Sequence, residues 1–106
     1  MAANKLVQIL LPTTAHPSGE QDLHGVFERL AAELTGRFGG VTSYRRAPAE
    51  GRWRNSAHDT DLDDITVVEV MVDAIDRAYW ADVRVRLEKE LSQDEIIIRC
   101  QPMELL

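Results

Sequence analysis

The chain is poor in the residues that mark several protein classes. It has 106 residues, of which one, Cys100, is a cysteine, so an intrachain disulfide and a cysteine zinc cluster are excluded. No apolar run approaches the ~20 residues of a membrane span. Leu6 to Leu11 are too few for a signal-peptide core. These absences favour a cytoplasmic protein without membrane partners.

The chain also lacks an excess of positive charge. Its net charge of −6 argues against general affinity for nucleic acid. The charge is uneven, because residues 37–54 carry five arginines against Glu50 alone, a local net charge of +4. The rest of the chain therefore carries −10. At this length the chain is one domain, spanning residues 1–106.

Hydrophobic periodicity predicts strand, helix, strand, strand, helix, strand. Strands are expected at 5–11, 41–47, 65–72 and 95–101, with a possible short return strand at 52–54. One helix follows a capping box at Ser18 and Gln21 and ends at Gly36, Gly39 and Gly40, and the second runs from about Ile75 to Leu91. This order is the ferredoxin-like split βαβ arrangement: an α+β domain with a four-stranded antiparallel sheet, order 4-1-3-2, and both helices on one face.

The two faces of the predicted sheet differ in cover. The face that the helices cover takes Val7, Ile9, Leu11, Val68, Val70, Val72, Ile96, Ile98 and Cys100, the last expected as core packing. The other face, called here the outer face, takes Leu6, Gln8, Leu10, Ile65, Val67, Glu69, Met71, Ile97 and Arg99. A solvated sheet face is normally polar, and this one is mostly aliphatic. Three segments or partners could cover the outer face: residues 48–64, the C-terminal PMELL, or a second copy of the chain in a homodimer. The homodimer is favoured here.

The polar exceptions on the outer face are the first site candidates. Arg99, Gln8 and Glu69 fall on neighbouring strands and are expected in one row. A buried row of this kind is either a structural ion pair bridged by glutamine or a polar site in an apolar cavity.

The arginine-rich segment is the second candidate. Guanidinium groups match carboxylates and phosphates, and aromatic neighbours suit stacking. Its tentative ligand-binding residues are Tyr44, Arg45, Arg46, Arg52, Trp53 and Arg54. A solvated hairpin, or ion pairs with the acidic residues 59–64, is the alternative.

Other chemistry finds little support. Asp59, Asp61 and Asp63 have calcium-loop spacing, but Asp64 and Val70 occupy the positions of the required glycine and glutamate, so neither a metal nor another cofactor is expected. The histidines at 16, 24 and 58 are expected on the surface.

Short motifs add a resemblance. Phe38-Gly39-Gly40-Val41-Thr42, Arg52-Trp53, Tyr79 and Ser92-Gln93-Asp94 before Ile96 to Arg99 resemble a family of small, uncharacterised bacterial proteins, with Leu91 in place of an aromatic residue. The resemblance covers about residues 5–101 and implies a domain of the dimeric α+β barrel type, but no activity and no catalytic residue.

Two functions are therefore expected. The first is a homodimeric binding or regulatory module for a small anionic molecule. The second is a cofactor-independent enzyme of the dimeric barrel type that acts on a small apolar substrate, with Glu69 or His16 as general base.

Overall fold

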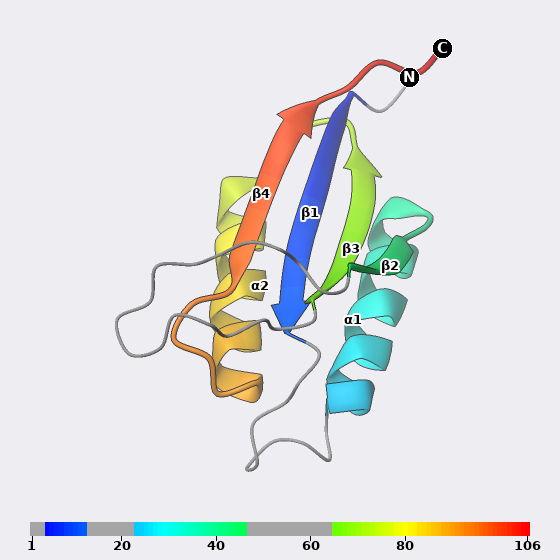
Figure 1. Cartoon of the computed structure of the whole chain (residues 1–106). Coiled ribbons are helices and arrows are strands. Elements are labelled where there is room, and N and C mark those ends of the chain that lie inside the picture. The colour runs from blue at the N-terminus through cyan, green and yellow to red at the C-terminus, as the bar shows by residue number, and fades with distance from the viewer. Residues whose placement is uncertain (1–3, 13–22, 47–64) are drawn as a thin grey trace.

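The computed structural model describes residues 4–12, 23–46 and 65–106. The elements are β1 (Lys5–Pro12), α1 (Leu23–Phe38), β2 (Thr42–Arg46), β3 (Ile65–Val72), α2 (Arg77–Glu90) and β4 (Ile97–Pro102). The strands form one antiparallel sheet in the order β2-β3-β1-β4, and both helices lie on one face of it (Figure 1). This is the predicted ferredoxin-like α+β fold, with the predicted strand order read from the opposite edge.

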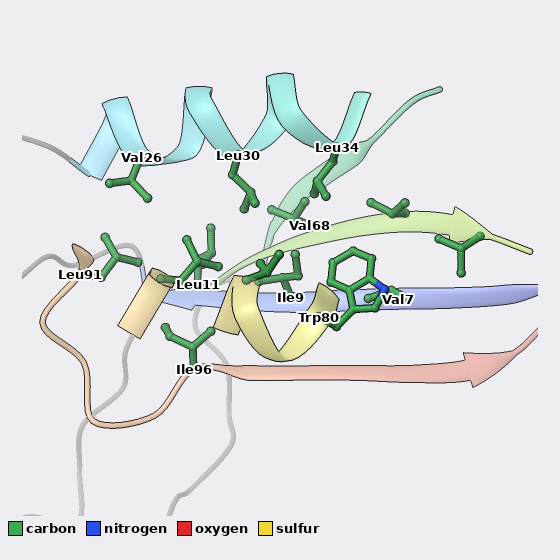
Figure 2. Packing of buried hydrophobic residues seen from close by; sticks show 14 residues of the cluster. Val7, Ile9, Leu11, Val26, Leu30, Leu34, Val68, Trp80, Leu91 and Ile96 are labelled. Atoms are coloured by element: carbon green, nitrogen blue, oxygen red, sulfur yellow. The ribbon is translucent and has the colours of Figure 1, made fainter. Parts of the chain in front are cut away.

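The core lies between the helices and the sheet, as the alternation of the strands predicts. Val7, Ile9 and Leu11 of β1 are at most 2% exposed and face the helices (Figure 2). The rest of the cluster consists of Val26, Leu30, Leu34, Val68, Val70, Val72, Trp80, Val83, Leu87, Leu91 and Ile96. Val85 of α2 is 52% exposed and faces away from the core.

The helix ends follow local chemistry. Helix α1 runs through Gly36, where the sequence predicts an end, and stops at Phe38. Gly39 has a φ of +94°, a left-handed conformation that glycine adopts without steric cost, and its N–H donates to the Thr35 carbonyl at 2.8 Å. Helix α2 begins after Asp76, whose carboxylate accepts the Tyr79 N–H at 3.1 Å. The predicted capping box at Ser18 and Gln21 lies outside the described residues.

Cys100 is the one residue of the helix-covered face that the sequence places wrongly. Burial falls along that side of the chain from Ile96, which is 2% exposed, through half-buried Ile98 to Cys100, which is exposed. Strand β4 is an edge strand, and a cavity separates this part of it from α2. The thiol therefore borders a pocket and is not packed in the core.

The packing at the centre of the core generates a stability prediction. Leu34 of α1 is fully buried against the sheet, so Leu34→Ala should lower the free energy of unfolding by about 2–5 kcal/mol. Val85→Ala, which truncates an exposed side chain on α2, should change it by less than about 0.5 kcal/mol. Urea denaturation followed by circular dichroism measures both, and similar losses for the two variants would contradict this packing.

Candidate functional site

A hydrogen-bonded row of four polar side chains crosses the outer face from one edge strand to the other. Arg99 Nε of β4 donates to Gln8 Oε1 of β1 at 2.9 Å, and Gln8 Nε2 donates to Glu69 Oε2 of β3 at 2.7 Å. The Tyr44 hydroxyl of β2 donates to the same Glu69 oxygen at 2.9 Å. The predicted row is therefore present, and Tyr44 extends it to the fourth strand.

The strand register makes this row. Gln8 lies directly opposite Glu69 in the β1–β3 pair and directly opposite Arg99 in the β1–β4 pair. The Gln8 amide has a donor end and an acceptor end, so it links a carboxylate to a guanidinium through its two opposite groups. The row carries one positive and one negative charge, and both hydrogen bonds to Gln8 involve a charged partner.

Aliphatic side chains flank the row on both sides. Leu6 lies opposite Met71 on one side, and Leu10 lies between Val67 and Ile97 on the other. Among these residues Met71 is 50% exposed and Ile97 is 39% exposed, whereas Val67 is only 1% exposed. The outer face is thus mostly aliphatic, as predicted. Its exposed aliphatic side chains are Met71 and Ile97, whereas Val67 is buried.

The arginine-rich segment is only partly placed by the structure. The backbone of β2 puts Arg45 opposite Thr66 and Arg46 opposite Ile65. Arg52, Trp53 and Arg54, the acidic residues 59–64, His16 and His58 lie outside the described residues. Of the tentative ligand residues, the structure brings together Gln8, Glu69, Arg99 and Tyr44. His24 is exposed, as predicted, and pairs with Glu28 at 3.8 Å.

A second polar network, which sequence reasoning missed, joins the two helices. The Tyr79 hydroxyl donates to Glu33 Oε2 at 2.6 Å, and Arg86 donates to both Glu33 oxygens at 3.1 and 2.9 Å. Arg86 Nε also donates to Asp82 at 3.0 Å. The Arg37 guanidinium lies 3.8 Å from the centroid of the Tyr79 ring. Spacing cannot reveal these contacts, because Tyr79 and Glu33 are 46 positions apart.

The pKa values in this network show stabilised charges. The hydrogen bonds from Arg86 lower the pKa of Glu33, and those to Glu33 raise the pKa of Arg86. Burial, followed by the hydrogen bond to Glu33, raises the pKa of Tyr79 to about 12. Because the carboxylate is engaged by a bidentate guanidinium and a phenol, we assign this network a structural role in fixing α1 against α2.

Comparison with known proteins assigns no family. No protein-family model matches the sequence, and no curated protein matches it. The resemblance to small bacterial proteins therefore stays a prediction. In the described ranges, neither helix is both long and apolar enough to cross a membrane.

The network between the helices predicts a stability loss at both ends of the pH scale. The lowered pKa of Glu33 gives stability that is present above about pH 4.5, its ordinary value, and is lost as the pH falls through the folded-state pKa. The raised pKa of Tyr79 gives stability that is present below pH 10 and is lost as the pH rises toward 12.

Two variants separate these effects. Tyr79→Phe should lower the free energy of unfolding by about 1 kcal/mol near neutral pH, and this difference from wild type should shrink above pH 10. Glu33→Gln should show a difference that shrinks below about pH 4.5. Urea midpoints measured across the pH scale test both, and differences that do not change with pH would contradict the assignment.

Proposed function

We propose that this protein is a homodimeric binding module for a small anionic molecule. In this proposal two copies pack their outer faces together, and the row of Arg99, Gln8, Glu69 and Tyr44 lies between them. The observation that supports it is the row itself: a charge-balanced, hydrogen-bonded polar strip enclosed by aliphatic side chains on both sides.

The exposed aliphatic side chains support the pairing of two copies. Met71 and Ile97 are 50% and 39% exposed, on opposite sides of the row. Apolar side chains gathered on one sheet face gain free energy when another apolar surface covers them. A two-fold symmetric dimer brings the same face from each copy, so Met71 and Ile97 of both copies are covered at once.

The hydrogen-bonding capacity of Arg99 supports the anionic ligand. Its Nε atom donates to Gln8, and among the described residues no acceptor binds its two terminal Nη groups. Covering the outer face withdraws water from that guanidinium, so its remaining N–H groups need another acceptor. A carboxylate or phosphate matches the guanidinium fork in both geometry and charge.

The enzyme hypothesis gains no comparable support. Gln8 and Tyr44 both donate to Oε2 of Glu69, which ties this carboxylate into the row and points to no reacting group. His16, the other predicted base, lies outside the described residues. We therefore argue only the binding function.

The dimer has a direct test in solution. Met71→Asp combined with Ile97→Asp places two charges among the aliphatic side chains of the outer face, and we expect the mass by analytical ultracentrifugation to fall from dimer to monomer at micromolar concentration. Val85→Asp is the matched control, because Val85 is as exposed as Met71 but lies on α2. A monomeric wild type, or equal effects of the two changes, would refute the dimer.

The ligand has a separate test. Titration calorimetry with inorganic phosphate and with acetate should show binding that Arg99→Ala weakens about tenfold or more. This is the change in affinity expected when a charge-assisted hydrogen bond is lost. Arg29→Ala, an equal change of net charge on α1, should leave the affinity within about twofold. Wild-type protein that binds neither anion, or an equal effect of Arg29→Ala, would contradict the anionic ligand.

A further inference from the structure

A pocket of about 270 Å³ lies between α2 and the edge strand β4, on the side of the sheet that the helices cover. Its apolar lining comes from Val7 of β1, Ile98 of β4, Ile75 and Trp80. Small-molecule sites have this composition, an apolar wall with a few polar groups, and volumes from about 300 Å³ upward. The pocket is therefore of a size for a ligand with few non-hydrogen atoms.

The charged side chains of α2 at this pocket are both cations. Arg77 and Arg84 line it, and they lie three and four residues from Trp80. Residues at this spacing are neighbours on one helix face, so Arg77 and Arg84 lie on either side of Trp80 along α2. Arg84 pairs with Glu88 at 3.2 Å, whereas no ion pair joins Arg77 to any described residue. Arg99 of β4 also lines the pocket, and no acidic side chain does.

Trp80 supplies a second and independent observation. The residue is only 7% exposed, and its ring stacks on Phe38 with centroids 5.5 Å apart and an angle of 11° between the planes. Its indole N–H donates to no acceptor in the described part of the chain, and Figure 2 shows the nitrogen on the side of Val7, another residue of the pocket lining. Buried donors in native proteins almost always have an acceptor. A buried donor left open beside a pocket is available to an acceptor atom of a ligand bound there.

We propose that this pocket binds a small carboxylate with an apolar body. Arg77 and Arg84 bind the carboxylate, the Trp80 N–H donates to one of its oxygens, and the apolar body lies against Val7 and Ile98. The side chains at the site offer donors and cations, so an anion with acceptor atoms fits and a cation does not. Most of the lining lies on the helix-covered side of the sheet, opposite the polar row, with Arg99 common to both, and the site does not depend on the dimer.

Fluorescence of Trp80 measures this binding directly. Trp53→Phe leaves Trp80 as the single tryptophan. We expect hexanoate and benzoate to change its emission in a saturable way, and the neutral hexanamide and benzamide to bind about tenfold more weakly or worse, because they lack the charge. No saturable change with either carboxylate, or equal affinity for the amides, would overturn the proposal.

Variants locate the site. Arg77→Ala combined with Arg84→Ala should weaken hexanoate binding about tenfold or more. The control that removes the same charge, Arg29→Ala combined with Lys89→Ala, should leave it within about twofold. Arg77 and Arg84 are exposed, so circular dichroism should confirm an unchanged fold. Equal weakening in the control pair would show a general charge effect and refute the site.

The same titration separates this site from the polar row. Gln8→Ala should retain the carboxylate-dependent change of Trp80, because Gln8 belongs to the row on the outer face and does not line the pocket. If Gln8→Ala abolishes that change and the Arg77 and Arg84 variant does not, the pocket is not the binding site, although the anionic ligand of the proposed function stands. The reverse result supports the pocket alone.

Discussion

The alternation of side chains along β1 is the constraint on which the rest of the structure depends. Val7, Ile9 and Leu11 enter the core, and Gln8 between them lies on the outer face. A slip of one residue against β3 and β4 would bring Gln8 under the helices and expose the three aliphatic residues. The core, the polar row and the wall of the α2–β4 pocket, to which Val7 contributes, are therefore fixed by one register.

The polar row adds a second restraint on the same register. A slip of two residues keeps the aliphatic face buried but sets Leu6 or Leu10 opposite Glu69 and Arg99, which removes both hydrogen bonds of Gln8. In that register Glu69 would keep only its hydrogen bond from Tyr44, and Arg99 would lose its acceptor in the row. We infer that the row selects one among the registers that the hydrophobic pattern alone would tolerate.

The sequence predicts the fold well because strand period and helix period are local properties. The same parity argument predicts Gln8, Glu69 and Arg99 in one row, and the structure has this row. It failed at Cys100, because burial on an edge strand depends on how far α2 extends over it, which no local pattern encodes. The contact of Tyr79 with Glu33 is also missed, since periodicity says nothing of a partner on the other helix.

The pocket shows the same limit from the functional side. In the sequence Arg77 and Arg84 cannot be told from other solvated arginines. They line a pocket only because α2 lies beside β4. In β4, Ile98, Arg99 and Cys100 border that pocket, and the side chain of Arg99 also joins the row on the outer face. The two proposed sites therefore meet at this edge strand of the sheet. Because β4 pairs with β1 alone, Arg99 is joined to the rest of the row only through Gln8 of β1.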